Sequence, residues 1–187
     1  MALELEKKYR LTPDLFQQIS SRLTAIGAVF EGEDEEENTI YNLQRLTGWA
    51  GILRIRSIGD KTILTFKKRI VSHSTVKQQI EHETEVTSRE SITAIIAELG
   101  LTPDVVYEKR RKIWSLPNAE VVLDVLPFGL YMEIEGTVDS IVETERLLEI
   151  EELPVEPRTY PNLTAEFGTR NGDSIESRFS SIAPEES

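Results

Sequence analysis

Apolar residues recur along the chain at two spacings, and each spacing predicts a different kind of secondary structure. Leu15, Ile19 and Leu23 are four residues apart and follow the sequence Thr12-Pro13-Asp14, which suits the first turn of a helix. The same helical period returns twice later in the chain. We therefore expect three amphipathic helices, over residues 13–26, 88–99 and 138–150.

Elsewhere apolar and polar residues alternate, as is typical of strands whose two faces lie in different surroundings. Turn-forming pairs such as Gly59-Asp60 and Pro117-Asn118 separate several of these stretches. The alternation predicts eight strands, over residues 3–11, 38–43, 52–58, 61–70, 78–86, 106–116, 120–126 and 130–136. Helices and strands together predict the α+β class, built on an antiparallel sheet.

Composition limits the chemistry that the chain can perform. Its 187 residues suit one globular domain, which we expect over residues 1–168, followed by a flexible acidic tail over residues 169–187. The chain has no cysteine, which excludes disulfides, thiolate metal sites and cysteine nucleophiles. With two histidines present, carboxylates are the expected metal ligands, so the ion would be a hard one such as Mg²⁺, Mn²⁺ or Ca²⁺.

The net charge of -12 argues against nucleic acid and anionic membranes as partners, because both attract proteins with a positive face. The N-terminus lacks a basic region followed by an apolar one, and no apolar run approaches the roughly 20 residues of a membrane span. We expect a soluble, cytoplasmic protein. We interpret the acidic stretch from Glu31 to Glu37 as solvated surface that carries no chemistry.

The charged residues of the predicted strands gather on one face. Residues two apart in a strand share a face, and the charges at this spacing form blocks of one sign, such as Glu4 with Glu6 and Arg54 with Arg56. For any single strand, this pattern is also typical of the solvent-exposed face of a half-buried sheet. When several strands carry such blocks, the like charges within each block repel one another unless opposite charges or ions lie close to them.

A closed sheet would resolve this repulsion. Its apolar face would point outward under the helices, and its charged face would line an interior that must hold counter-charge. Carboxylates would bind divalent cations, while arginines and lysines would bind phosphate oxygens. A metal-chelated polyphosphate is one ligand that needs both. A lipid-carrying barrel is the alternative for a closed sheet, but its lumen would be apolar.

The charged segments resemble the CYTH superfamily, also called triphosphate tunnel metalloenzymes, which includes class IV adenylyl cyclases, thiamine triphosphatases and inorganic triphosphatases. The resemblance spans nearly the whole chain, and its strength lies in the order and spacing of the motifs. In chain order these are Glu4-x-Glu6-x-Lys8, Leu53 to Arg56, Thr65 to Lys67, Glu81-x-Glu83, Tyr107 to Arg111, and Val122 to Gly136.

The resemblance implies an eight-stranded antiparallel β-barrel, the triphosphate tunnel, with a charged interior and helices packed outside. It also implies Mg²⁺ or Mn²⁺ as cofactor. The implied metal ligands are Glu4, Glu6, Glu133 and Glu135, with Glu81, Glu83 and Asp124 as supporting or second-metal ligands. The implied phosphate-binding residues are Lys8, Arg54, Arg56, Lys67, Lys109 and Arg111. Lys8, Glu4 and Glu6 are the residues for which it implies a catalytic role.

Three features of the sequence depart from this pattern or leave it open. Gln79 stands where relatives often have an arginine, and Tyr41-Asn42-Leu43 stands where many have tyrosine, phenylalanine and aspartate. The basic run from Lys109 to Lys112 also permits a shift of one residue, which would turn Arg110 and Lys112 inward instead.

We therefore expect a metal-dependent enzyme that hydrolyses a triphosphate, namely inorganic triphosphate, ATP or another nucleoside triphosphate, or thiamine triphosphate. The first alternative is a class IV-type adenylate cyclase, which would convert ATP to cyclic AMP and pyrophosphate. The second is a protein of the same fold that binds polyphosphate or nucleotide without turnover. We expect a monomer or a homodimer.

Overall fold

The structure is a computed structural model that describes residues 2–43, 51–70 and 77–180, without the side chains of residues 2–4, 69–70 and 77–79. Its helices are α1 (Pro13–Ala25), α3 (Arg89–Glu98), α4 (Val138–Leu148) and α5 (Tyr160–Phe167). Its strands are β1 (Ala2–Leu11), β2 (Val29–Asn42), β3 (Ile52–Ile58), β4 (Lys61–Ile70), β5 (Lys77–Val86), β6 (Val105–Leu116), β7 (Ala119–Leu126), β8 (Gly129–Gly136), β9 (Thr169–Asn171) and β10 (Ser174–Ser177).

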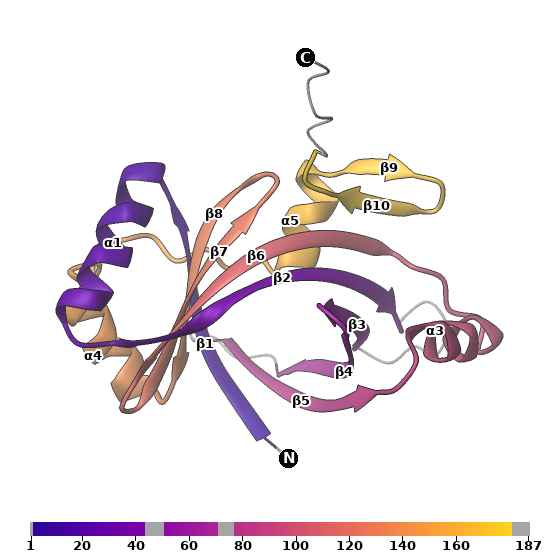
Figure 1. Cartoon of the computed structure of the whole chain (residues 1–187), viewed down its shortest axis with the longest axis horizontal. Coiled ribbons are helices and arrows are strands. Elements are labelled where there is room, and N and C mark those ends of the chain that lie inside the picture. Colours follow the sequence, from indigo (N-terminus) through magenta and orange to yellow (C-terminus); the bar gives the residue numbers. More distant parts are fainter. Residues whose placement is uncertain (1, 44–50, 71–76, 181–187) are drawn as a thin grey trace.

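Eight of the strands are antiparallel neighbours in the order β2-β3-β4-β5-β1-β8-β7-β6. Strand β2 also pairs with β6, so the order of pairing returns to its start and the strands curve around a common interior (Figure 1). The predicted α+β fold with an eight-stranded antiparallel sheet is confirmed. We call these eight strands the barrel.

Helices α1, α3 and α4 cover the outside of the barrel, as predicted. Helices α1 and α4 lie together on one side and α3 lies on the opposite side (Figure 1). Under the first pair, Ile19 and Ile141 pack with Tyr9 and Met132 of the strands, and each of these four side chains is fully or almost fully buried. Burial of one such side chain stabilises the fold by about 1.5–3 kcal/mol. A separate cluster around Ile55 and Ile96 lies under α3.

The fourth helix, α5, packs inside one end of the barrel and was not predicted. Its Tyr160 and Leu163 belong to a cluster with Ile40 and Val105, which share strand faces with inward-pointing charged residues. The helix is short, with few apolar residues to reveal a period. A local signal was present, because Thr159 and Asn162 form a capping box at its start.

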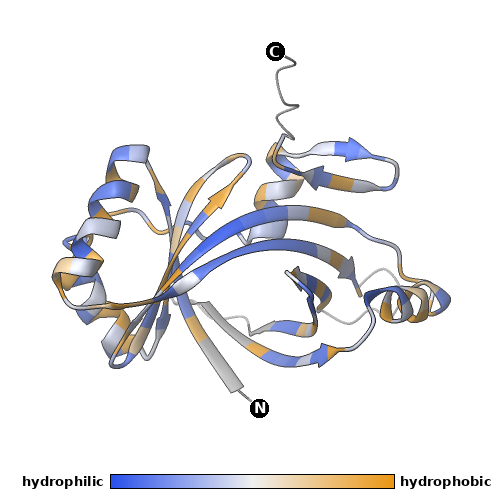
Figure 2. Ribbon diagram, viewed as in Figure 1, coloured by the Kyte–Doolittle hydropathy of each residue, from blue (hydrophilic) through white to orange (hydrophobic). Residues whose placement is uncertain are grey.

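The interpretation of the acidic stretch from Glu31 to Glu37 as solvated surface is wrong for part of it. Strand β2 begins at Val29, nine residues before the predicted start, and the stretch pairs with β6. The register sets Glu36 opposite Lys109 and Glu35 opposite Arg110. Acidic and basic runs from distant parts of the sequence thus neutralise each other. Figure 2 shows the resulting hydrophilic middle of β2 and β6.

Within the predicted tail, residues 169–171 and 174–177 form two strands, and residues 181–187 lie outside the described part of the chain. Strand β7 pairs with β6 from Arg110 onward, and β10 pairs in parallel with β6 at Val105, Val106 and Tyr107. An unpaired sheet edge is thereby covered. Across the described ranges, no helix is long and apolar enough to cross a membrane.

Candidate active site

The register of the barrel brings the predicted charged residues into neighbouring positions on its inner face. Lys8 lies opposite Glu133 across β1 and β8, and Glu6 lies opposite Glu135 two residues further on. Arg111 lies opposite Asp124 across β6 and β7. Glu4 lies in β1, but its side chain is outside the described residues, as is that of Gln79.

Lys8 is held at the centre of this face and is 1% exposed. Its Nζ lies 3.2 Å from Glu133 Oε1 and donates to the carbonyl oxygen of Arg158 at 3.2 Å. The same ammonium lies 3.6 Å from the centroid of the Tyr160 ring. A buried ammonium is costly unless it is paired, and these contacts supply the pairing.

Arg111 joins two of the predicted carboxylates. Its Nε and Nη2 donate to the two oxygens of Asp124 at 2.8 and 2.6 Å, and Nη2 also donates to Glu133 Oε2 at 2.6 Å. Burial disfavours the charge of Arg111, but Asp124 and then Glu133 outweigh it and raise the pKa of Arg111 well above its ordinary value. The guanidinium is therefore fixed in a forked geometry that also suits phosphate oxygens.

Glu36, a residue that sequence reasoning did not select, lies among the cations. It is 4% exposed, with Oε2 at 3.3 Å from Lys109 Nζ and 3.6 Å from Arg56 Nε, and it accepts a hydrogen bond from Asn38 Nδ2 at 3.1 Å. Burial alone would raise the pKa of Glu36, yet Lys109, Arg111 and Arg56 hold it well below its usual range. Glu36 is thus an ionised internal counter-charge.

The basic run of β6 faces inward through Lys109 and Arg111. Lys109 is 3% exposed and lies between Glu36 and Asp124, whereas Arg110 and Lys112 make ion pairs with exposed glutamates of β2 outside. Burial and the neighbouring Arg111 lower the pKa of Lys109. The structure therefore shows the unshifted register of this run.

A second group of charges continues the inner face across β3, β4 and β5. Arg54 Nη2 donates to Thr65 Oγ1 at 3.2 Å and lies 3.5 and 3.4 Å from Glu81 and Glu83. Lys67 Nζ lies 2.6 Å from Glu81 Oε2. Glu83 is the most open of these carboxylates, with a side chain that is 43% exposed.

Four buried polar atoms of this face have no hydrogen-bond partner within the part of the chain that the structure describes. They are the Nε atoms of Arg54 and Arg56, the Oδ1 atom of Asn38 and the hydroxyl oxygen of Tyr131. Buried polar atoms are nearly always paired, so orphaned ones call for an explanation. Donors on two neighbouring arginines are suited to the oxygens of a bound anion.

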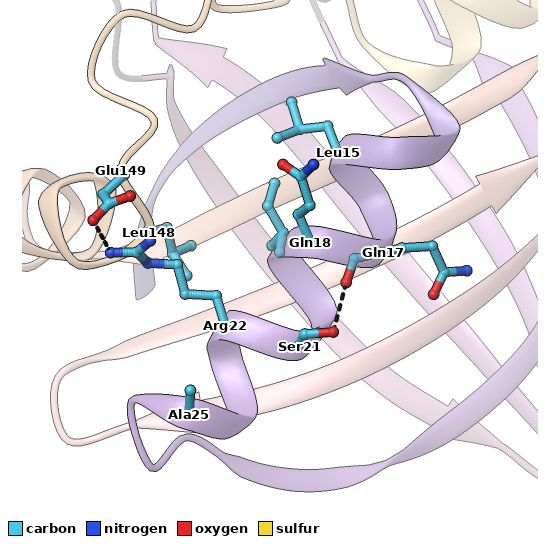
Figure 3. Close-up of a pocket in the computed structure, with 9 residues that line it drawn as sticks. Leu15, Gln17, Gln18, Ser21, Arg22, Ala25, Leu148 and Glu149 are labelled. Atoms are coloured by element: carbon cyan, nitrogen blue, oxygen red, sulfur yellow. Dashed lines mark hydrogen bonds and ion pairs between the residues drawn. The ribbon is translucent and has the colours of Figure 1, made fainter.

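A pocket of about 570 Å³ lies elsewhere, on the outside of the barrel between α1 and the end of α4 (Figure 3). The cation among its lining residues is Arg22, which is paired with Glu149 and donates Nε to the carbonyl oxygen of Leu147 at 2.7 Å. Its charge serves to join the two helices. The inner face of the barrel is therefore the better candidate for the active site.

Comparison with known proteins decides the family. The family model of the CYTH domain matches residues 2–160, which include every charged residue of the inner face. The chain belongs to the CYTH family. Among curated proteins, no sequence matches this CYTH chain.

Solved structures share the fold. The PH1012 protein from Pyrococcus horikoshii OT3 is 28% identical, with a TM-score of 0.75 over 86% of this chain and 98% of that one. A putative adenylate cyclase from Vibrio parahaemolyticus is 19% identical, with a TM-score of 0.70 over 87% and 98% of the two chains. The putative adenylyl cyclase HpAC1 from Hippeastrum, described as having a dominant triphosphatase activity, is 19% identical, with a TM-score of 0.64 over 86% and 93%. The last two show the CYTH fold alone.

CYTH proteins generally depend on a metal, and the carboxylates here fit one as a donor set. In the described ranges, no three carboxylate or histidine residues converge closely enough to hold an ion by themselves. Mg²⁺ is commonly bound by one or two carboxylates together with substrate phosphates and water, so a complete protein cage is not required. Glu6 and Glu135, opposite each other at the end of the charged face, supply hard oxygen ligands of this kind.

Proposed function

We propose that this CYTH protein is a metal-dependent enzyme that hydrolyses a triphosphate bound on the inner face of its barrel. The observation that carries the proposal is the pair of buried Nε atoms of Arg54 and Arg56, which have no hydrogen-bond acceptor among the described residues. A triphosphate supplies acceptor oxygens for these donors and further negative charge beside the cations. The proposed phosphate-binding residues are Lys8, Arg54, Arg56, Lys67, Lys109 and Arg111.

The proposed divalent ion is Mg²⁺ or Mn²⁺, held by Glu4, Glu6, Glu133 and Glu135 with Glu81 and Glu83 in support. When bound, it would supply charge neutralisation of the phosphate oxygens and a lower pKa for a coordinated water. For Asp124 we propose a different role from that of a metal ligand. Both of its oxygens accept hydrogen bonds, from Arg111 and from Tyr160, so it orients Arg111 toward the phosphates.

The chain's own residues would do the remaining work by electrostatics and positioning. Arg54 and Arg56 would grip the phosphate chain from β3, while Lys109 and Arg111 would grip it from β6. The ammonium of Lys8, fixed from several sides, would neutralise charge that develops on the phosphate oxygens in the transition state. No covalent nucleophile is needed for this reaction.

A product analysis tests the proposal against its alternatives. The purified protein would be incubated with inorganic triphosphate, ATP or thiamine triphosphate plus Mg²⁺ or Mn²⁺, and phosphate, pyrophosphate and cyclic AMP would be separated. Hydrolysis predicts phosphate release, whereas cyclisation predicts cyclic AMP with pyrophosphate. Binding of triphosphate without any product would identify a non-catalytic protein.

Matched variants assign the activity to this chain and not to a contaminant. Arg111→Ala removes an inward guanidinium, and Arg110→Ala removes its outward neighbour on the same strand. We expect the first variant to lose most of the activity and the second to keep it. Equal activity in both would mean that the reaction does not take place on the inner face.

A further inference from the structure

Tyr160 is the first residue of α5, and its side chain reaches the charged inner face. Its hydroxyl donates to Asp124 Oδ2 at 2.6 Å. Its ring centroid lies 3.6 Å from Lys8 Nζ and 5.4 Å from Lys109 Nζ. One side chain therefore contacts charged groups from β1, β6 and β7, although it comes from the end of the chain that follows the barrel.

The two ends of the Tyr160 side chain make different interactions. The face of an aromatic ring attracts a nearby ammonium, and the attraction is strongest when both groups are removed from water. Burial and the charge of Asp124 raise the pKa of the Tyr160 hydroxyl well above its ordinary value, so the hydroxyl stays protonated and acts as a donor. Asp124 in turn holds Arg111 through both of its oxygens.

The segment that leads into α5 fixes Tyr160 relative to Lys8. The backbone N–H of Glu156 donates to the carbonyl oxygen of Lys8 at 2.7 Å, and Val155 forms an isolated β-bridge with Tyr9. The carbonyl oxygen of Arg158 accepts a hydrogen bond from Lys8 Nζ. This segment therefore runs beside β1 at Lys8, and the backbone and side chain of Lys8 are both held from it.

The start of α5 is itself firmly set. Thr159 caps the helix in a capping box with Asn162, and Pro161 restricts the backbone of the first turn. The rings of Tyr107 and Tyr131 pack against that of Tyr160 at centroid distances of 6.2 and 5.6 Å. The ring has little freedom to leave the ammonium groups.

We infer that Tyr160 is a positioning residue of this active site, which orients Lys8 through its ring and Arg111 through its hydroxyl and Asp124. The inference rests on the proposed function for its consequence in catalysis. The structural part of the inference, that Tyr160 holds Lys8 in place, depends only on the contacts between these two residues. The two roles separate chemically, because phenylalanine keeps the ring and leucine removes both the ring and the hydroxyl.

Steady-state kinetics on inorganic triphosphate with Mg²⁺ or Mn²⁺ would compare Tyr160→Phe and Tyr160→Leu with the wild type. Tyr160→Phe should raise KM by a few fold and leave kcat within about threefold, because Arg111 keeps its direct bonds to Asp124. Tyr160→Leu should lower kcat by about 10–100-fold, since a misplaced charged group loses transition-state stabilisation. Equal kcat in the two variants would overturn the role of the ring.

Leu163→Ala is the matched control for a merely structural effect. Leu163 is buried in the same helix and the same apolar cluster as Tyr160, and we assign it no contact with a phosphate or metal ligand. We expect this variant to lose thermal stability and keep the kcat of the wild type at temperatures where it is folded. A loss of kcat as large as that of Tyr160→Leu would mean that α5 acts through packing alone.

A second measurement separates failure of this inference from failure of the proposed function. Reductive methylation followed by mass spectrometry reports the accessibility of each lysine without any need for turnover. Lys8 should resist methylation in the wild type and in Tyr160→Phe, and react at least about tenfold faster in Tyr160→Leu. If no triphosphate is bound or hydrolysed, the proposed function is wrong. The methylation rates still test whether Tyr160 holds Lys8 in place. Continued protection of Lys8 in Tyr160→Leu would overturn the inference even in an active enzyme.

Discussion

Glu36 and Lys109 face each other across β2 and β6 in the interior of the barrel, with Oε2 and Nζ 3.3 Å apart. Both side chains are almost completely buried. The carboxylate also lies 3.6 Å from Arg56 Nε and 3.9 Å from Arg111 Nε. Glu36 therefore joins Asp124 in supplying the negative charge that stabilises these cations.

Glu36→Gln should destabilise the protein and make its stability more dependent on ligand. Removal of one partner from a buried ion pair costs about 3–5 kcal/mol, or a melting temperature lower by roughly 6–20 °C for a chain of this size. Inorganic triphosphate should raise the melting temperature of the variant more than that of the wild type, because its charge replaces the missing carboxylate. Glu35→Gln, on the outer face of the same strand, is the control and should change little. Equal shifts in the two variants would contradict this account.

The stability that Glu36 contributes should depend on pH with a defined sign. The folded state holds its pKa below the usual range, so the unfolded chain binds the proton first as the pH falls. The contribution is therefore fully present above about pH 4.3, the ordinary pKa of glutamate, and is progressively lost below it. Urea unfolding of the wild type and Glu36→Gln between pH 7 and pH 3 should show a difference in free energy that narrows below about pH 4. A difference that is constant over this range would mean that folding does not lower the pKa of Glu36.

The sequence predicted most of the barrel but not the residues that complete its site. Alternation within single strands sufficed to group Glu6 with Lys8 and Arg54 with Arg56, because such a pattern is local. It left the register of Arg111 open, since every position from Lys109 to Lys112 is basic. Glu36 lies in a run of acidic residues that resembles solvated surface, and it is revealed by a register with β6, about 70 residues away in the chain. The role of Tyr160 depends on the path of the chain after α4, which brings this residue back to the inner face. The local spacing of apolar residues does not reveal such a path.

Lys109→Ala and Arg110→Ala should differ sharply in their effect on ligand binding, because neighbouring residues of a strand point to opposite faces. Lys109 faces inward and is buried, whereas Arg110 pairs with the exposed Glu35 outside. We expect the first variant to bind inorganic triphosphate at least about tenfold more weakly in calorimetric titrations, and the second to bind like the wild type. Weaker binding in Arg110→Ala alone would imply the shifted register.

Activity should require added divalent metal and disappear with EDTA, because the expected ligands are carboxylates that cannot act on phosphate without a cation between them. Glu6→Gln and Glu135→Gln should each lower kcat by orders of magnitude with little loss of thermal stability. Glu98→Gln, an exposed residue of α3, is the control for the loss of one negative charge. Turnover in chelated buffer at the full rate, or unchanged kinetics in both site variants, would refute the assignment of the metal ligands.

Metal and triphosphate should stabilise the protein together by more than the sum of their separate effects. The inner face carries groups of carboxylates and groups of cationic side chains. The metal ion would neutralise the carboxylates and the triphosphate the cations, so binding of each ligand favours binding of the other. A ligand present at about 100 times its dissociation constant adds roughly 2.7 kcal/mol to the free energy of unfolding, which corresponds to a rise in melting temperature of about 5–10 °C.

Thermal melts with Mg²⁺, with inorganic triphosphate and with both, at low and moderate salt, would measure this coupling. Charges that face open water would give small, additive shifts that moderate salt abolishes, since exposed ion pairs are weak and screened. That result would exclude binding inside the barrel, whereas a synergistic shift that persists in salt requires a site shielded from solvent.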